Sequence, residues 1–385
     1  MKRKVCVITG SRAEYGVLYH TIQKIALSHE LELQLVVTGM HLASAFGNTV
    51  HEIEADGFPI ADRVEMLIAS DSKAAIGKSV GLGVIGFVDC FKNLNPDIVL
   101  LVADRFEMFA AATAAMMMNL PIAHISGGEI SEGLIDEQIR HAITKMSHLH
   151  FVAIEENAAR VKQMGEEPWR VKIVGGPWMD NFKEFTPYSR EEIKAKLGVE
   201  LSSPTILVTY HPVTLEQEKV DENIEALFDA LKLVKGEIIF TYPNADTGGG
   251  KIIKAIELFQ IGRPHVKAFR SLGRQMYFSL LKQVDIMVGN SSSGILEALP
   301  FQLPVVNIGN RQKGRFTTGN IISVTDDKED IYNAIQRGLS EDFKLNIKGM
   351  SNPYDQGDTA GSIVEILKTV DLGPRLLSKS FVVEA

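Results

Sequence analysis

Three carboxylates and one guanidinium in the first half of the chain are of the types that move protons or stabilise charge in enzymes. Asp104 comes directly after an apolar run, and Glu129 comes after a second apolar run and two glycines. Asp136 and Arg140 are four residues apart, so they would share one face of a helix. Asp104 could equally cap a helix, but nothing about a helix start requires a carboxylate directly after two glycines.

The residues around Glu129 have separate explanations. Gly127 and Gly128 allow backbone conformations closed to other residues and would let a ligand approach the chain. Glu132 and Glu137 are predicted to be ordinary solvated charges, which the helix dipole favours near a helix start.

A second group of polar residues lies in "DIMVGNSSSGILEALP", residues 285 to 300. A strand followed by hydroxyls, a glycine and a helix start is typical of a site that holds phosphate with backbone N–H groups. Glu297 is expected in the first turn of that helix, where it would repel phosphate and suit a sugar diol. His211 follows another apolar run, in "LVTYHPVT", where a structural and a functional histidine are equally expected. The basic loop "NIGNRQKGR" adds Arg311 near the same mouth.

Two arginines in the first half also follow apolar runs. Arg12 lies in "ITGSRAEYG", where a helix start and a guanidinium would suit a phosphate, although a surface arginine at a plain turn explains it equally well. Arg105 is the neighbour of Asp104. The residues that we expect to contact a substrate are Arg12, Arg105, Arg140, Asn244, Asn290, Ser291, Ser292, Ser293, Gly294, Glu297 and Arg311.

These residues lie at the ends of predicted strands. The chain contains two series of such strands. Apolar β-branched runs alternate with helical patterns, which predicts parallel sheets covered on both faces. The predicted strands are 4–9, 33–38, 97–102, 121–125, 149–153, 171–174, 205–209, 237–241, 265–267, 285–288, 304–308 and 321–324.

These two series predict an α/β protein of two Rossmann-like, doubly wound domains. We place the domains at residues 1–178 and 179–365, with a tail, 366–385, that could pack back on the first domain. Ligands bind beyond the carboxyl ends of such strands, so two domains facing each other would hold a ligand in the cleft between them.

Two glycine-rich matches do not indicate a nucleotide cofactor. "GLGVIG" at 81–86 fits the GxGxxG pattern but does not follow a strand, and a glycine-rich helix packed closely against a neighbour explains it better. "GKS" at 77–79 resembles the end of a P-loop, but the required upstream glycine is Ser72.

Composition narrows the classes of function and the cell compartment. A chain of 385 residues is too long for one ordinary hydrophobic core, so two domains are expected. The net charge of −8 argues against a nucleic-acid partner. Cys6 and Cys90 lie in no CxxC pair, so neither a zinc site nor a disulfide framework is expected, which fits a reducing cytosol. The first apolar run is too short for a signal peptide, and stretches such as 108–118 are too short to span a bilayer. We expect a cytoplasmic protein without a membrane partner.

Together these motifs resemble the UDP-N-acetylglucosamine 2-epimerase family, which has a GT-B-like fold. The resemblance covers nearly the whole chain and is carried by "GSRAEYG", "TGMHLASAFGNT", "DRFE", "GGEISEGLIDEQIRHAITKMSHLH", "HPVT", "GNSSSG" and "NRQKGR". The chain is most similar to the hydrolysing branch of sialic-acid-type pathways, since non-hydrolysing members tend to carry "GTRPE" and "AGLR" at the corresponding places. One departure is Ala103, where the family usually has glycine.

The resemblance implies release of UDP and inversion of the sugar at C2, by anti elimination to a glycal and addition of water. Asp104, Glu129 and Asp136 match the family's acidic catalytic positions. His211 would donate a hydrogen bond or a proton to the departing phosphate. The resemblance implies no nicotinamide or other cofactor, and it suggests a homodimer or a higher homo-oligomer.

The expected reaction converts UDP-N-acetylglucosamine to N-acetylmannosamine and UDP. The alternatives are the same reaction on a UDP-2,4-diacetamido-2,4,6-trideoxyhexose of the legionaminic-acid pathway, a non-hydrolysing 2-epimerase and a GT-B glycosyltransferase. A sensor that binds a UDP-sugar without turnover is a further alternative.

Overall fold

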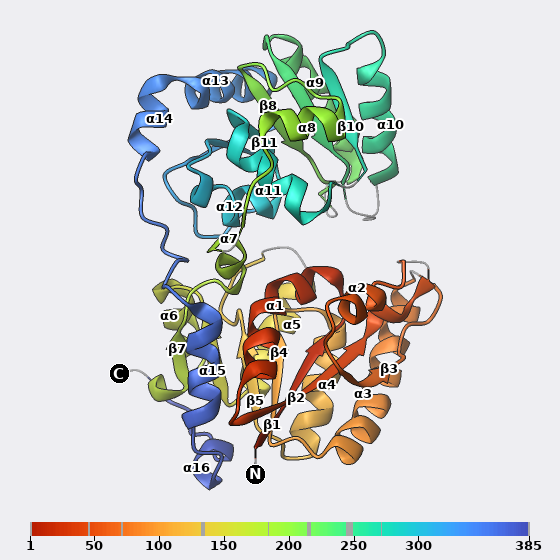
Figure 1. Cartoon of the computed structure of the whole chain (residues 1–385), viewed down its shortest axis with the longest axis vertical. Coiled ribbons are helices and arrows are strands. Elements are labelled where there is room, and N and C mark those ends of the chain that lie inside the picture. The colour runs from red at the N-terminus through yellow and green to blue at the C-terminus, as the bar shows by residue number, and fades with distance from the viewer. Residues whose placement is uncertain are drawn as a thin grey trace. The chain divides into compact units, whose positions relative to one another are not determined.

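The computed structural model describes residues 2–44, 47–70, 72–131, 135–183, 185–213, 217–243, 249–270 and 272–383. The chain divides into two units, drawn as ribbons in Figure 1. The first unit is Met1–Ile130, Leu134–Glu184 and Pro353–Ala385, and the second is Ser131–Gly133 and Phe185–Asn352. The domain limits suggested by the sequence stay a prediction beside this division.

The first unit contains a sheet of seven strands in the order β3-β2-β1-β4-β5-β6-β7. Its strands are β1 (Arg3–Thr9), β2 (Leu31–Thr38), β3 (Ile60–Val64), β4 (Ile98–Val102), β5 (Ile122–Ile125), β6 (Leu149–Val152) and β7 (Val171–Ile173). Successive side chains of a strand point to opposite faces. Val5 and Val7 of β1 accordingly belong to one buried cluster, and Cys6 and Ile8 belong to another. Both faces are covered, which is why the inner strands of this sheet are apolar without alternation.

The second unit contains six parallel strands in the order β10-β9-β8-β11-β12-β13. They are β8 (Thr205–Thr209), β9 (Glu237–Thr241), β10 (Val266–Phe269), β11 (Ile286–Gly289), β12 (Val305–Ile308) and β13 (Ile321–Val324). Numbered within its own unit, this sheet runs 3-2-1-4-5-6, the Rossmann order, and the first sheet has the same order with a seventh strand added at the end. The prediction of two doubly wound α/β sheets is confirmed.

Helices connect the strands in both units. Those of the first unit are α1 (Arg12–Leu27), η1 (Gly39–Leu42), α2 (Val50–Ala55), α3 (Lys73–Leu94), α4 (Phe106–Met117), α5 (Ile135–Met146), α6 (Glu155–Gln163), η3 (Pro168–Arg170), η4 (Pro177–Met179), α7 (Asp180–Lys183), α15 (Thr359–Thr369) and α16 (Pro374–Leu377). Those of the second are α8 (Arg190–Leu197), η5 (Gln217–Lys219), α9 (Val220–Lys232), α10 (Gly249–Gln260), α11 (Gly273–Gln283), α12 (Ser292–Leu296), η6 (Leu299–Phe301), α13 (Lys328–Leu339) and α14 (Glu341–Ile347).

Strand β3 is not among the strands predicted from the sequence. Its sequence, IADRV, carries Asp62 and Arg63, and alternate side chains are exposed. The strand lies at the edge of the sheet. It therefore lacks the continuous apolar run by which the inner strands are recognised.

The glycine-rich stretch at 81–86 lies inside α3, as predicted. A Cβ on Gly83 would come within 2.7 Å of Met66, and one on Gly86 would come equally close to Val64. The glycines thus allow the helix to approach the chain around β3, and the prediction of close packing is confirmed.

One helix among the described residues has the length and composition to cross a membrane, which corrects the expectation that no apolar stretch is long enough. It is Ala74–Leu94 of α3, with a mean hydropathy of 1.5 over a window that is 33% buried. Core helices pass the same test, and Phe87, Cys90 and Phe91 of this helix lie in the core of the first unit. The helix alone is therefore weak evidence for a membrane.

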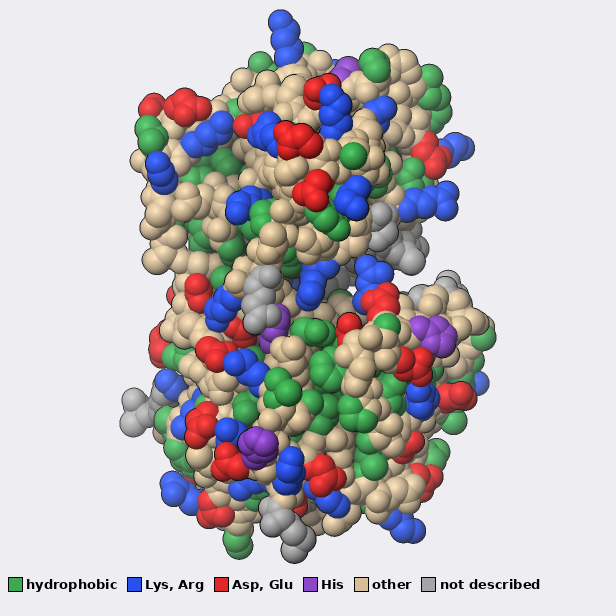
Figure 2. All heavy atoms as spheres, viewed as in Figure 1, with side chains coloured by type: hydrophobic (Ala, Val, Ile, Leu, Met, Phe, Trp, Pro, Cys, Tyr) green, Lys and Arg blue, Asp and Glu red, His purple; other side chains and the backbone are tan. Residues whose placement is uncertain are grey.

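The surface carries both signs of charge. On the face drawn in Figure 2, Lys and Arg side chains are interspersed with Asp and Glu side chains over both units. On this face the net charge of −8 does not gather into one acidic region.

The C-terminal segment is fastened within the first unit. Buried Arg170 donates hydrogen bonds to the backbone carbonyl oxygens of Arg375, Leu376 and Ser378. Helix α15 packs on α1. This packing closes the face of the sheet that α1 covers.

Candidate active site

Three neighbouring strands of the first sheet lead into residues predicted to be functional. Strands β1, β4 and β5 are adjacent and parallel, so the residues after them share the carboxyl edge, where such sheets bind ligands. Arg12 follows β1, Asp104 and Arg105 follow β4, and Glu129 follows β5. The sheet therefore brings these residues to one edge.

Arg140 on α5 connects the two strand ends that carry the carboxylates. Its guanidinium forms an ion pair with Asp104, and its Nη1 donates to the backbone oxygen of Glu129 at 2.9 Å. The Arg140 side chain is only 2% exposed. Asp104 does not cap helix α4, since the cap position is held by Arg105. Of the two roles considered for Asp104, the structure therefore supports the one at the strand-end site.

Glu137 corrects a prediction. It is not an ordinary solvated charge, because its carboxylate lies 3.4 Å from Arg140 Nη1 and 3.0 Å from His141 Nε2. Its side chain is 23% exposed. Glu137 thus helps to hold the Arg140 guanidinium, whereas Glu132 lies outside the described residues.

Both strands leave the sheet through a residue in the left-handed backbone region. Ala103, directly before Asp104, has φ +60°, and Ser126, before the two glycines, has φ +67°. Non-glycine residues adopt this region at an energetic cost and do so mostly where the surroundings enforce it, often at functional sites. Ala103 thus keeps the conformation that the glycine usual in the family would adopt easily.

The two glycines are required by the protein's own atoms, which changes the prediction that they admit a ligand. A Cβ on Gly127 would lie 3.1 Å from Thr144 Oγ1 and 3.2 Å from His124 Nδ1. Gly128 has φ +75°, and a Cβ there would lie 2.4 Å from the backbone oxygen of Asn157. The turn that carries Glu129 is therefore packed tightly between β5, α5 and α6.

Arg105 interacts with two buried carboxylates that were not predicted from the sequence, Glu107 through hydrogen bonds and Glu14 through its charge. Glu107, fully buried, accepts from Arg105 Nε at 3.1 Å and Nη2 at 3.2 Å. Glu14 accepts from the Gly10 N–H at 2.8 Å. Burial, and next the charge of Glu107, raises the pKa of Glu14 to about 7. Burial acts to lower the pKa of Arg105, but the charges of Glu107 and then Glu14 outweigh it and raise that pKa.

Arg12 and Asp136 lie at the starts of two helices of this unit. Arg12 begins α1, and its side chain is 56% exposed and 3.8 Å from Glu52. Asp136 lies in the first turn of α5, and its charge contributes to raising the pKa of Arg105. Their proposed roles rest on this placement.

A cavity of about 690 Å³ adjoins Arg105 within the first unit. Its walls come from the segments after β2 and β3 and from the start of α4. Met40, Leu42, Met66, Ile68 and Phe106 give it an apolar character. It lies at the carboxyl edge of the sheet and could accept an apolar group beside the charged residues.

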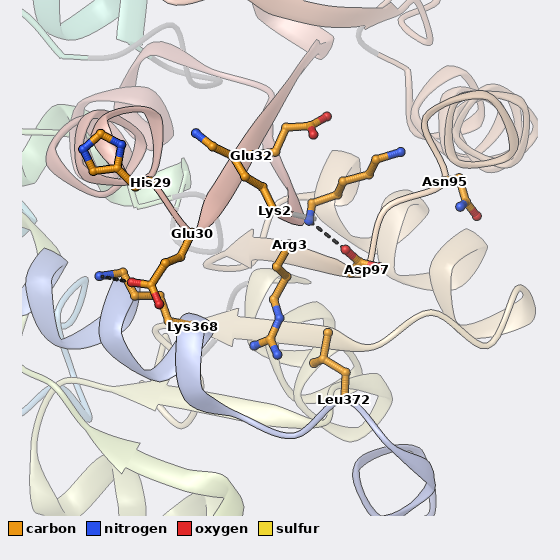
Figure 3. A pocket seen from close by; sticks show the side chains of 10 residues that line it. Lys2, Arg3, His29, Glu30, Glu32, Asn95, Asp97, Lys368 and Leu372 are labelled. Atoms are coloured by element: carbon orange, nitrogen blue, oxygen red, sulfur yellow. Dashed lines mark hydrogen bonds and ion pairs between the residues drawn. The ribbon is translucent and has the colours of Figure 1, made fainter.

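A larger cavity, of about 1110 Å³, lies at the opposite, amino edge of the same sheet. Figure 3 shows Glu30 and Lys368 directed toward each other there, at 3.4 Å. Asp97 accepts from the backbone N–H of Lys4 at 2.7 Å. Charges here contact one another, and ligands of parallel sheets bind at the other edge, so we do not place the site here.

In the second unit, His211 and Arg311 meet around Asn290. The Asn290 amide accepts from the His211 N–H at 2.7 Å and donates to the His211 oxygen at 2.9 Å. Arg311 Nη1 donates to the Asn290 backbone oxygen at 3.0 Å. Burial, and next the charge of Arg311, lowers the pKa of His211 to about 3. His211 is therefore a neutral imidazole near pH 7, able to donate a hydrogen bond but poorly able to supply a proton.

The serine-rich turn begins the short helix α12. Ser291 caps it by accepting from the Ser293 N–H at 3.3 Å. The Ser293 hydroxyl contacts Tyr277 Oη at 2.8 Å and donates to Glu297. A Cβ on Gly294 would lie 2.9 Å from Val305, so this glycine allows the helix to approach β12.

Glu297 corrects a second prediction. It lies at the C-cap of α12, not in its first turn, because the helix ends at Leu296 after five residues. Burial raises the pKa of Glu297, and its bond with Ser293 opposes that shift. The repulsion from bound phosphate that a first-turn position would cause is therefore smaller than expected. Asn244 lies outside the described residues.

The residues missed by sequence reasoning are His124, Glu14 and Glu107. Each lies within or near a motif that carries the resemblance. His124 bonds to Ala103 after the neighbouring strand, and Glu14 interacts through its charge with Glu107 on another helix. Glu107 itself bonds to Arg105, two residues before it. For His124 the sequence did contain a signal, since it is a polar residue inside an apolar run.

Comparisons with known proteins identify the family of the chain. The family model described as UDP-N-acetylglucosamine 2-epimerase matches residues 23–368. The UDP-N,N'-diacetylbacillosamine 2-epimerase (hydrolyzing) of Legionella pneumophila is 38% identical over 98% of this chain and 99% of its own. The UDP-N-acetylglucosamine 2-epimerase of Neisseria meningitidis serogroup B is 34% identical over 96% and 95%.

A solved structure supports the fold. The UDP-GlcNAc 2-epimerase of Neisseria meningitidis bound to UDP-GlcNAc aligns with a TM-score of 0.79 over 94% of this chain and 99% of that one, at 17% identity. The resemblance given by the motifs is thus confirmed. The chain belongs to the UDP-N-acetylglucosamine 2-epimerase family.

Proposed function

We propose that the chain is a hydrolysing UDP-sugar 2-epimerase that converts UDP-N-acetylglucosamine and water to N-acetylmannosamine and UDP. The observation that carries the proposal is the contact of one buried guanidinium, that of Arg140, with both Asp104 and the backbone of Glu129. It fixes two carboxylate-bearing strand ends with respect to each other, as acid–base chemistry at one sugar carbon requires.

The reaction needs no oxidant or reductant. A carboxylate removes the C2 proton while the C1–O bond to UDP breaks, and the C–H electrons form the double bond of a glycal. Water then adds at C1, and a proton returns to C2 from the opposite face. The C2 proton has no adjacent carbonyl, so breakage of C1–O runs ahead and places positive charge on the ring, which carboxylates stabilise. We assign Glu129 and Asp104 closest to these steps and Asp136 as their assistant.

The second unit is proposed to receive the nucleotide. The backbone N–H and the hydroxyl of Ser292, together with Arg311, suit a diphosphate. Neutral His211 would donate a hydrogen bond to the leaving phosphate. Glu297 accepts a hydrogen bond from Ser293. We assign it to the ribose hydroxyls and not to the phosphates.

Incubation with UDP-N-acetylglucosamine in deuterated water, followed by NMR, tests the proposal. We expect free UDP and N-acetylmannosamine with deuterium at C2. UDP-N-acetylmannosamine without free UDP would indicate a non-hydrolysing epimerase. Transfer of the sugar to an acceptor without C2 exchange would indicate a glycosyltransferase, and tight UDP binding without turnover would indicate a sensor.

A second substrate, a UDP-2,4-diacetamido-2,4,6-trideoxyhexose, is favoured by two observations. The Legionella pneumophila relative is named for such a sugar. The apolar cavity beside Arg105 suits the extra acetamido methyl and the C6 methyl. Comparison of kcat/KM for the two sugars in one preparation distinguishes the substrates, and Met66→Gln should lower kcat/KM mainly for the diacetamido sugar if this cavity holds those methyl groups.

A further inference from the structure

His124 lies at the junction of the three segments that carry the proposed catalytic residues. It is fully buried at the carboxyl end of β5. Its Nε2 lies 2.8 Å from the Ala103 backbone oxygen, and its Nδ1 lies 3.2 Å from Thr144 Oγ1 on α5. A carbonyl oxygen only accepts, so the ring proton is on Nε2 and Nδ1 accepts from the threonine hydroxyl.

The contact with Ala103 acts on the residue next to Asp104. The Ala103 N–H donates to the Ile125 backbone oxygen at 3.0 Å, and its carbonyl accepts from His124. Both backbone groups of Ala103 are therefore tied to β5. These bonds oppose the strain of its left-handed conformation and fix the direction in which Asp104 leaves the strand.

The contact with Thr144 acts on helix α5. Thr144 is one turn beyond Arg140, the partner of Asp104. Gly127 lies against both hydrogen-bonding atoms, at distances where a Cβ would crowd them. The imidazole therefore touches the Asp104 strand end, the turn before Glu129 and the helix of Arg140.

We propose that His124 is a positioning residue, which sets Asp104 and Arg140 in register through Ala103 and Thr144 and does not itself contact the sugar. The catalytic part of this inference rests on the proposed 2-epimerase activity. Burial lowers the pKa of His124 to about 4, which agrees with a neutral ring held as one tautomer.

Two substitutions at His124 separate a positioning role from a purely structural one. His124→Phe keeps a ring but removes both hydrogen bonds, and we expect kcat to fall by roughly 10²-fold, the scale of a misplacement of about 1 Å. KM and the affinity for UDP should change by less than about threefold. His124→Gln, which can still donate to the Ala103 oxygen, should keep kcat within about tenfold of the parent.

A rescue at Ala103 tests the route of action. Glycine adopts φ +60° without strain, so Ala103→Gly combined with His124→Phe should recover at least about tenfold in kcat. Ala103→Gly alone should stay close to the parent. His148→Phe is the matched control, because buried His148 accepts from the Ile122 N–H at the other end of β5. It should lower the melting temperature without lowering kcat.

The outcomes separate this inference from the proposed function. If the parent has no epimerase activity, nitrogen NMR of the imidazole still tests the anchor, which predicts an Nε2-protonated His124 whose signal changes in Thr144→Val. The inference is overturned by a folded His124→Phe protein with parental kcat. It is also overturned if His124→Gln loses as much as His124→Phe and Ala103→Gly restores nothing.

Discussion

At the residue scale, the guanidinium of Arg140 is held in place by two acidic neighbours and one backbone carbonyl. Arg140 presents several donors in a fixed plane, and it contacts Asp104, Glu137 and the Glu129 backbone. Arg140 binds Glu129 through the backbone oxygen of that residue, whereas it pairs with Asp104 through the carboxylate. This distinction makes Glu129 the sharpest residue to test.

Glu129→Gln should cut turnover by at least about 10²-fold, the low end for loss of acid–base help. The amide keeps the shape of the side chain but cannot take a proton. UDP binding should be unchanged, because the residues proposed to bind the nucleotide lie in the second unit. Rates of UDP release and calorimetric titration with UDP check the two parts. Glu156→Gln, on exposed Glu156 in the first turn of α6, is the control, and near-parental turnover of Glu129→Gln would remove Glu129 from the mechanism.

Ser292→Ala should weaken UDP binding by roughly 3- to 10-fold, the worth of one hydrogen bond. Among the three serines, Ser291 caps the helix and Ser293 holds Glu297, which leaves the Ser292 hydroxyl for the phosphates. Calorimetric titration measures the affinity. Ser340→Ala removes the cap of α14 and should lower stability without affecting UDP. Equal UDP affinities in Ser292→Ala and the parent would count against this turn as the phosphate site.

At the element scale, the parallel strands were predictable because burial on both faces makes them apolar throughout. The edge strand β3 was not, because Asp62 and Arg63 interrupt its pattern. The position of Glu297 was wrong because the sequence does not reveal that α12 ends after five residues. The interactions of Glu14 with Glu107 and of His124 with Ala103 join segments that lie in or after neighbouring strands of the sheet but are distant in the chain, which no local pattern contains.

Arg140 helps to fix helix α5 to the sheet edge, so Arg140→Lys tests the placement of the helix as well as a charge. A lysine keeps the charge but has a single ammonium, which cannot reach Asp104 and the Glu129 oxygen in the same fork geometry. We expect kcat to fall by roughly 10- to 10²-fold with a modest change in KM.

Arg160→Lys is the comparison for Arg140→Lys, because Arg160 on α6 donates to the Gly128 oxygen in the same turn. It touches the turn from the other side without contacting Asp104. If the two variants lose activity equally, the turn as a whole matters and the link from α5 to Asp104 does not. Hydrogen exchange along α5 should increase in Arg140→Lys alone.

At the scale of the whole molecule, the buried carboxylate of Glu14 makes the free energy of unfolding depend on pH. Folding raises the pKa of Glu14 from 4.5 to about 7. Its contribution to stability is therefore fully present below about pH 4.5 and is lost as the pH rises through about 7. Each pKa unit of such a shift corresponds to about 1.4 kcal/mol.

Glu14→Gln should remove this loss, because the amide stays neutral and its oxygen can still accept from the Gly10 N–H. The free energy of unfolding, measured in urea from about pH 5 to about pH 8, should fall less with rising pH in the variant than in the parent. Buried His124, His148 and His211 have lowered pKa values and act in the opposite direction, since their unfolded forms take up protons below about pH 6.5. Both proteins share these histidines, so the difference between the two pH profiles isolates Glu14. Parallel profiles would mean that Glu14 is ionised in the folded protein throughout, and that Arg105 neutralises both of its buried acidic neighbours.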